Sequence, residues 1–285
     1  MDISINGEKA DITLESEKNI GEILAGLEYW LANSDPRYNE GFRLSGLSID
    51  GHVIGADSLE DSFNRDIDSV DSIDITILSL AELVAEALLD SRQAIDEFNG
   101  CDFAGKRVFA EKWKTSPAAL MISEESPDLY EIILNTFSGV GISVDGLTAI
   151  IDERLRELEF PAKELNDMNP VITEIAGRLE ELPLDIQTGK DRRAAETVSF
   201  FSGIAEKIFR IFKLLKIRGF PVDDIRVAEI LVSDYIGEFN DVIKELLQAY
   251  EQQDSVLVGD LAEYELAPRL RGLYAALNIS STEAA

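Results

Sequence analysis

The sequence predicts an α+β protein, with a small mixed sheet at the N-terminus followed by a mostly α-helical body. Before residue 79, apolar residues alternate with polar ones in short runs, as in half-buried strands. From residue 80 onward they recur at helical spacing. The 285 residues are 45% hydrophobic, which is typical of folded domains. We therefore expect a sheet domain over 1–79, an all-α domain over 80–279 and a frayed tail over 280–285.

The first two strands are expected to form a hairpin. Ile3 and Ile5 alternate with polar residues. Asn6-Gly7 follows and suits a type I′ turn, because both central residues of that turn need positive φ. Ile12 and Leu14 indicate the second strand of the hairpin.

A helix is expected next, with Asn19 as its N-cap and Glu22 reaching back as in a capping box. Its apolar stripe consists of Ile20, Ile23, Leu24, Leu27, Trp30 and Leu31. Residues 33–41 are expected to form a loop, because they are rich in polar residues, Pro and Gly.

The remaining strands follow this loop. The third strand, with a shift of register near Gly46, is indicated by Phe42, Leu44, Leu47 and Ile49. Asp50-Gly51 marks a turn, and Val53-Ile54 is expected to pair back. The closing strand carries Val70, Ile73, Ile75 and Ile77.

This order of elements resembles the β-grasp (ubiquitin-like) fold over residues 1–79. That family includes carriers and modifiers that act through a free Gly-Gly tail. Here Leu78-Ser79-Leu80 leads directly into a helix, so the resemblance implies an interaction domain and not a carrier.

The body is expected to be an all-α bundle. Its first stripe runs from Leu80 to Phe98 and ends at Asn99-Gly100, a suitable C-terminal cap. Further boundaries are indicated by Ser116-Pro117, Ser126-Pro127 and Gly139-Val140-Gly141. Pro161 is expected to start another helix, which Pro170 should kink. The last three helices are expected over about 190–217, 222–250 and 256–277, with a bend in the third near Pro268.

Residues 254–268 are similar to C-terminal helical segments of uncharacterised bacterial proteins, some of them associated with motility genes. The resemblance implies a bacterial protein without enzymatic activity.

The chain is strongly acidic, with a formal net charge of -29. Residues 189–218 are the exception, at +5. An acidic surface disfavours nucleic acid and anionic lipid and favours partners with basic surfaces, although acidity also serves solubility alone. One cysteine excludes an internal disulfide, and the first residues lack the features of a signal peptide. We expect a cytoplasmic protein without stable membrane association.

Four features of the sequence could carry chemistry, and for each of them a structural role is favoured. Residues 100–107 nearly match a phosphate-binding P-loop, but Arg107 stands where that motif needs Ser or Thr, so a loop between helices is favoured. His52 is expected to be an exposed turn residue, and Cys101 a buried, inert thiol. Carboxylates at helical spacing are expected to form solvated faces; they are Asp234, Glu238, Asp241, Asp260 and Glu263. We predict no cofactor and no metal site.

The basic segment 190–218 is the clearest exception to the acidic character of the chain. Its bases include Lys207, Arg210, Lys213 and Lys216, and a broad apolar face lies between them. A core helix whose cations reach acidic neighbours is favoured. A surface for a partner or a second copy is the main alternative, and membrane binding is disfavoured.

We predict a non-enzymatic adaptor or scaffold of a bacterial assembly such as the motility apparatus. The expected partner-binding residues are Phe42, Leu44 and Leu47 on the third strand and the four bases Lys207, Arg210, Lys213 and Lys216. A chaperone-like protein that shields an apolar segment of a partner is the first alternative. An enzyme with a carboxylate-held metal is the second, and a homo-oligomer fits the adaptor as well.

Overall fold

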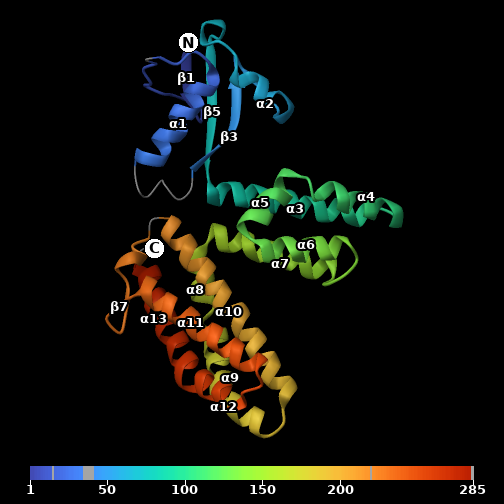
Figure 1. The fold of residues 1–285 in the computed structure, drawn as a ribbon, viewed down its shortest axis with the longest axis vertical. Helices are drawn as coiled ribbons and strands as arrows, with labels where there is room; N and C mark the ends of the chain where they lie inside the picture. Colours follow the sequence, from blue (N-terminus) through green and yellow to red (C-terminus); the bar gives the residue numbers. More distant parts are fainter. Residues whose placement is uncertain (15, 35–41, 219, 284–285) are drawn as a thin grey trace. The chain divides into compact units, whose positions relative to one another are not determined.

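A computed structural model describes residues 1–14, 16–34, 42–218 and 220–283 (Figure 1). The chain forms two compact units, Met1–Leu155 and Arg156–Ala285. The boundary between the units falls inside the region 80–279, which was expected to be helical. Of the expected loop 33–41, residues 35–41 lie outside the described residues.

The first unit begins with a five-stranded mixed sheet in the order β2-β1-β5-β3-β4. The strands are β1 (Asp2–Ile5), β2 (Glu8–Lys9), β3 (Phe42–Ile49), β4 (His52–Val53) and β5 (Ser72–Ser79). β1 runs parallel to β5, and the other neighbouring strands are antiparallel. The sheet followed by helices confirms the predicted fold class.

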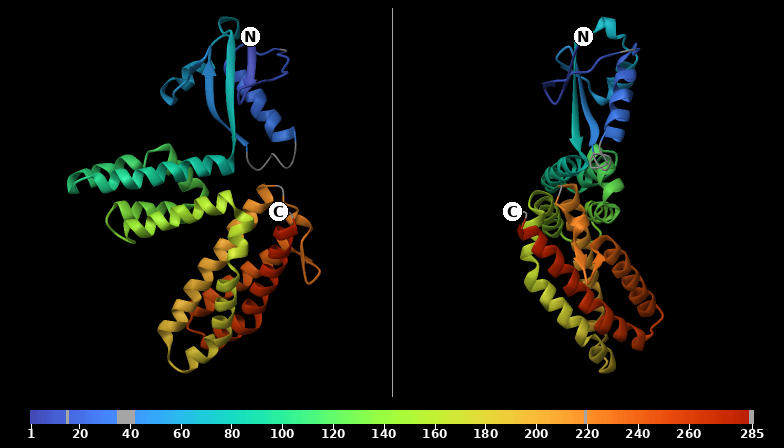
Figure 2. Two further views of the ribbon diagram at one scale, coloured as in Figure 1. Left: turned by 180° about the vertical axis from the view of Figure 1, so that it is seen from behind. Right: turned by 90° about the vertical axis from the view of Figure 1, so that its left-hand side faces the viewer.

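Helix α1 (Ile20–Ser34) lies across one face of this sheet (Figure 2). Asn19 caps it, since its Oδ1 accepts a hydrogen bond from the Glu22 amide at 3.0 Å. The Glu22 carboxylate reaches back, but it accepts the Lys18 amide at 2.6 Å instead of the Asn19 amide that a capping box would use. The buried face of the sheet packs against the helix through Ile3, Leu47, Ile49, Ile73, Ile75 and Ile77.

The predicted shift of register in β3 is confirmed. Leu44 lies opposite Ile77 and Gly46 lies opposite Thr76, so one residue between them is extra. The bulge returns Leu47 and Ile49 to the buried face.

The second strand was predicted in the wrong place. The Asn6-Gly7 turn forms, with φ of 52° and 78°, but the returning strand β2 ends at Lys9. Ile12 is 39% exposed, so its alternation with Leu14 does not mark a buried strand face. The polar stretch after β4 also contains helix α2 (Ala56–Phe63) and a 3-10 turn, η1 (Ile67–Ser69), which were not predicted.

Five helices follow the sheet. They are α3 (Leu80–Gly100), α4 (Phe103–Trp113), α5 (Pro117–Glu125), α6 (Pro127–Phe137) and α7 (Val144–Glu159). The prolines at residues 117 and 127 each occupy the first helical turn, as predicted. Aromatic rings hold α3, α4 and α6 together: Phe137 lies 4.8 Å from Phe98, 5.5 Å from Phe109 and 5.4 Å from Trp113 between centroids.

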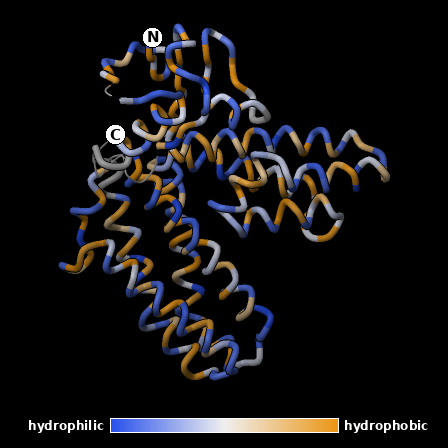
Figure 3. The backbone as a smooth tube through the Cα atoms, turned by 45° about the horizontal axis from the view of Figure 1, so that its top comes forward, coloured by the Kyte–Doolittle hydropathy of each residue, from blue (hydrophilic) through white to orange (hydrophobic). Residues whose placement is uncertain are grey.

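The second unit is a helical bundle with one small hairpin. Its elements are α8 (Pro161–Asp167), α9 (Asn169–Gln187), α10 (Asp191–Ile217), η2 (Val222–Asp224), β6 (Arg226–Val227), β7 (Ile230–Leu231), α11 (Val232–Glu251), α12 (Ser255–Asp260), η3 (Leu261–Leu266) and α13 (Ala267–Glu283). Orange and blue stretches alternate along its helices in Figure 3, as expected of amphipathic segments. Helix α10 contributes Phe201, Ile208 and Ile211 to the core, each without solvent exposure.

The predicted helix from residue 222 is wrong in its first ten residues. They form η2 and the β6–β7 hairpin, whose turn residues Ala228 and Glu229 both have positive φ. Both residue types favour helices, so local preference predicts the opposite structure. Burial of Val227 against Gly272 of α13 stabilises the hairpin instead.

The predicted bend near Pro268 is a π-helical turn. The Ala267 amide bonds to the Ala262 carbonyl, five residues back, at the end of η3. A proline inside a regular α-helix would clash with the carbonyl four residues before it. The wider turn therefore accommodates Pro268 without ending the helix. Helix α13 then continues to Glu283, beyond the expected start of the frayed tail.

We expect Phe201→Ala to destabilise the second unit by about 3–5 kcal/mol, because it leaves a cavity beside Phe239, 6.0 Å away between ring centroids. Urea denaturation combined with hydrogen exchange of peptides from Arg156–Ala285 measures this. Phe103→Ala is the matched control, since Phe103 is 95% exposed and its removal should leave stability unchanged. Equal losses in both variants would contradict the packing described above.

Asp50 gives a pH-dependent contribution to the sheet domain. Its Oδ1 accepts the Ser72 amide at 2.9 Å and the Asp71 amide at 2.8 Å. The Ser72 bond, the Asp71 bond and the charge of Arg65 lower the pKa of Asp50 below 3.8. A lowered pKa stabilises the folded state at neutral pH, and this contribution is lost as the pH falls through the lowered value.

We therefore expect Asp50→Asn to be less stable than the wild type at pH 7, with a difference that closes in acid below the usual carboxyl pKa. Thermal unfolding of the full chain across this pH range measures it. Asp61→Asn, a change at an exposed position of α2, should match the wild type throughout. If the stability difference between Asp50→Asn and the wild type grew in acid, the direction given for the pKa shift of Asp50 would be wrong.

Candidate functional site

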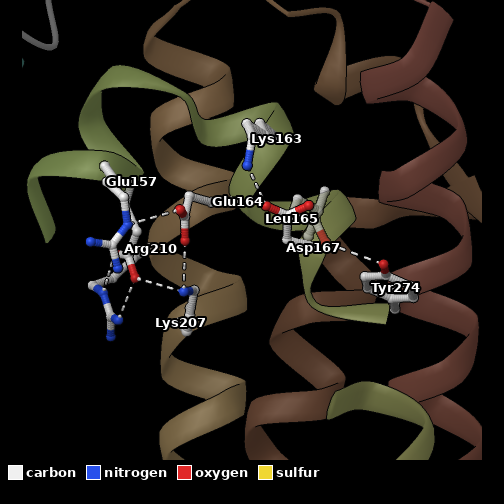
Figure 4. A network of polar contacts seen from close by, with 9 residues as sticks. Glu157, Lys163, Glu164, Leu165, Asp167, Lys207, Arg210 and Tyr274 are labelled. Carbon is white, nitrogen blue, oxygen red and sulfur yellow. Dashed lines mark hydrogen bonds and ion pairs between the residues drawn. The ribbon is translucent and has the colours of Figure 1, made fainter. Parts of the chain in front are cut away.

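The basic face of α10 meets buried acids of its own unit (Figure 4). Arg210 binds Glu157 through two parallel hydrogen bonds, Nε to Oε2 and Nη2 to Oε1, both 3.1 Å long. Lys207 Nζ lies 3.0 Å from Glu164 Oε2 and 3.7 Å from Glu157 Oε1. Arg156 completes the group at 3.3 Å from the other oxygen of Glu164. We call these five residues the α10 ion-pair network.

The network is mostly shielded from water. The Glu157 side chain is 2% exposed, and those of Glu164 and Lys207 are largely buried. A buried carboxylate loses its hydration, so close cations and hydrogen bonds must replace it. Glu157 sits in the last turn of α7 and Glu164 in α8, so the network ties both segments to α10.

A neighbouring contact strengthens the position of α8. The Tyr274 hydroxyl of α13 donates toward the carbonyls of Leu165 and Asn166, 3.2 Å from each (Figure 4). Burial raises the pKa of Tyr274, and the charge of Asp167 raises it further, so the hydroxyl keeps the proton that it donates. Asp167 itself binds Lys163 at 2.5 Å.

Several other bases of the segment also have acidic neighbours. Lys216 lies 3.4 Å from Asp223. At the start of α10, Lys190 and Arg193 each lie 3.2 Å from the buried Oδ1 of Asp185. Lys213 is exposed and takes part in an interaction as well. Of the four bases predicted to bind a partner, Lys207 and Arg210 are thus brought together inside the unit, and Lys216 binds locally.

The predicted residues of β3 lie in the sheet domain and do not join this network. Leu47 is buried, whereas Phe42 and Leu44 are half-buried against the core under α1. They therefore act first as core residues. β3 pairs with β5 along its length, but its other edge pairs with β4 only near Ser48 and Ile49 among the described residues.

Glu157 and Glu164 were not predicted as partners of the basic helix. Arg210 and Glu157 are 53 residues apart in the sequence. No spacing rule connects residues so far apart. The available signal was an excess of bases in one helix of an acidic chain, which indicates that acids must face it but does not say which ones.

The P-loop-like segment forms no loop that could hold a phosphate. Asp102 caps α4, and its Oδ1 accepts the Gly105 amide at 2.7 Å. This amide is one of the donors that a phosphate would need, and a carboxylate already occupies it. Cys101 is half-buried and donates its thiol to the Glu97 carbonyl at 3.3 Å. His52 lies exposed in β4.

The helical carboxylates are spread among separate contacts. Glu238 lies 3.3 Å from Arg269, and Asp241 lies 2.9 Å from Lys244. Within the described ranges, no three His, Cys, Asp or Glu side chains converge as metal ligands do. A search of the same residues finds no helix that is both long and apolar enough to span a membrane.

We expect Glu157→Ala to destabilise the second unit by about 3 kcal/mol, because it leaves Arg210 and Lys207 without their shared carboxylate. This is the lower end of the range for a broken buried pair, since Arg210 is partly exposed. Urea denaturation gives the value. Glu159→Ala, two residues further along α7 and exposed, is the control and should stay within about 0.5 kcal/mol of the wild type. Similar losses in both would refute the role of the network.

Comparisons with known proteins match separate parts of the chain. Residues 1–79 match the TP0873 N-terminal domain, the same range as the predicted sheet domain. Residues 163–276 match a domain of unknown function, DUF8042, and lie within the second unit. An uncharacterized protein of Treponema pallidum (strain Nichols) is 23% identical over 273 residues, which cover 96% of this chain and 94% of that protein. No solved structure matches the chain.

Proposed function

We propose that the protein is a non-enzymatic cytoplasmic adaptor whose N-terminal domain binds an extended segment of a partner protein. In this proposal residues 1–79 are a β-grasp domain, and the docking site is the second edge of β3. One observation carries the proposal: over Arg43–Gly46, no strand of the described residues pairs with this edge.

An unpaired strand edge offers amide and carbonyl groups that a further strand can bind. Peptides that add a strand in this way gain affinity from the main-chain bonds and specificity from their side chains. The bulge at Ser45 contributes a local twist that limits how long a stretch can pair. The site therefore suits a short segment.

Charge favours a basic partner. Residues 1–79 carry 17 acidic and 5 basic side chains, for a net charge of -12. Such a field speeds association with a basic segment and slows association with an acidic one. Exposed acidic side chains on the strands, such as Asp2 on β1, contribute to this negative charge.

The helical part has a different place in the proposal. Because Lys207 and Arg210 already bind Glu157 and Glu164, they support a rigid body and not a docking surface. A second partner would have to use another face of that body. The association with a motility apparatus stays a prediction.

Site-specific photocrosslinking in the host cell tests the docking site. We expect p-benzoyl-phenylalanine at Ser45 of the full chain to give a discrete adduct with one protein, because this position lies on the open edge of β3. Mass spectrometry should place the adduct on a basic, extended segment of that protein. The same probe at Ser58, exposed on α2 of the same domain, is the control and should give no such adduct.

The variant Ser45→Lys, without the probe, should reduce co-purification of that protein, since a lysine at a strand edge disfavours pairing. Ser58→Lys adds the same charge to the same domain and should leave co-purification intact. Equal adducts at the two positions, or an acidic crosslinked segment, would refute the docking site.

A further inference from the structure

Helix α4 presents an unusual outward face. Phe103 is 95% exposed and Val108 is 70% exposed. Arg107 and Lys112 are exposed between and beyond them. These four side chains, here called the α4 face, combine apolar and basic groups on the same half of one helix.

The orientation of this helix is well determined by its inner side. Trp113 is buried and stacks on Tyr130 at 5.7 Å, and Phe109 lies 5.9 Å from Phe98. Lys106 covers the Phe98 ring at 4.8 Å. Because aromatic and cationic contacts fill this side, rotation cannot bury Phe103 without exposing Trp113.

The basic side chains of the α4 face form no ion pair among the residues that the structure describes. Lys114 binds Glu111 at 2.8 Å, but Arg107 and Lys112 form no ion pair with any described residue. Most other bases of this acidic chain have an acidic partner. Two unpaired bases beside two exposed apolar side chains have the composition of an interface.

A complementary stripe lies near the C-terminus. Val256 is 74% exposed and Tyr264 is 66% exposed, with Asp260 exposed midway between them. The three are spaced four residues apart along α12 and the π-helical turn η3, so they follow one line. Glu263 adds a second acid beside Tyr264. Asp260 forms no ion pair among the described residues. We call these four residues the C-terminal stripe.

We propose that the α4 face of one copy binds the C-terminal stripe of a second copy. Phe103 and Val108 then cover Val256 and Tyr264, while Arg107 and Lys112 meet Asp260 and Glu263. Charge complementarity supports this occupant. Two bases and two acids that form no ion pair within the described ranges would meet, and apolar groups lie beside both pairs. The proposal goes beyond the adaptor function, since it involves neither β3 nor a foreign protein.

The two surfaces differ, so the contact is head-to-tail. Interfaces of this kind close into rings or extend into filaments, according to the rotation that relates the copies. The proposed interface involves only two short helical segments. Interfaces of small buried area are typical of reversible association. The net charge of -29 opposes the approach of two copies, but at physiological ionic strength it is screened beyond about 8 Å.

Sedimentation of the full-length protein at physiological ionic strength tests the proposal. We expect the wild type to associate reversibly as its concentration rises. The double variants R107E/K112E and D260K/E263K should each associate at least about tenfold more weakly, because like charges then face each other. Circular dichroism should show that both remain folded, since Arg107, Lys112 and Asp260 are exposed and Glu263 is half-buried.

A mixture of the two double variants tests directly whether the two surfaces bind each other. The intact stripe of the first fits the intact face of the second, and the two reversed surfaces also have opposite charges. Association should therefore return in the mixture to about the wild-type level. The control variant K18E/K244E changes the net charge by the same amount as R107E/K112E at two other exposed positions, and it should associate like the wild type.

Three results would overturn the proposal. They are a wild type that stays monomeric at every concentration, double variants that associate as strongly as the wild type, and a mixture that does not recover. A change of shape that is independent of concentration would assign the contact to one chain and would also refute it. Failure of photocrosslinking at Ser45 leaves these outcomes unaffected.

Discussion

The second unit depends on the burial of one carboxylate. Glu157 can stay inside the unit because Arg210 and Lys207 reach it from α10, one turn apart. The two parallel bonds from Arg210 restrict the rotation of α10 about its own axis. That rotation decides that Phe201 and Ile208 point into the core. The ion pairs thus select the orientation of the helix, and the apolar packing supplies most of the stabilisation.

Elements with strong local signals were predictable from the sequence. Helix α1 has a capping residue and a complete apolar stripe, and α10 has a broad one, so both were placed within one or two residues. The bulge in β3 was also predictable, because Leu44 and Leu47 cannot share a sheet face unless one residue is extra. In each case, the evidence lies within a few neighbouring positions.

Elements that depend on distant contacts were not predictable in this way. The β6–β7 hairpin contains Ala228 and Glu229, which favour helix, and it exists because Val227 packs against α13. The pair Glu157–Arg210 joins residues 53 positions apart. The sequence shows that residues 190–218 are basic. Only the three-dimensional structure shows which acidic residues lie next to them. The α4 face was not predicted, because residues 100–107 were expected to form a loop between helices and α4 begins at Phe103.

The π-helical turn at Leu261–Leu266 makes the C-terminal helix sensitive to length. Removing one residue from it would restore the regular α-helical hydrogen bonding and place Pro268 inside an ordinary helix, which costs about 3 kcal/mol. The wide turn already absorbs one extra residue, so the rest of α13 would keep nearly the same face toward the core after the deletion. Tyr274 would then still reach the carbonyls of Leu165 and Asn166, and the cost would fall on the backbone around Pro268. A deletion in this segment should therefore be less well tolerated than one in the turn before α12.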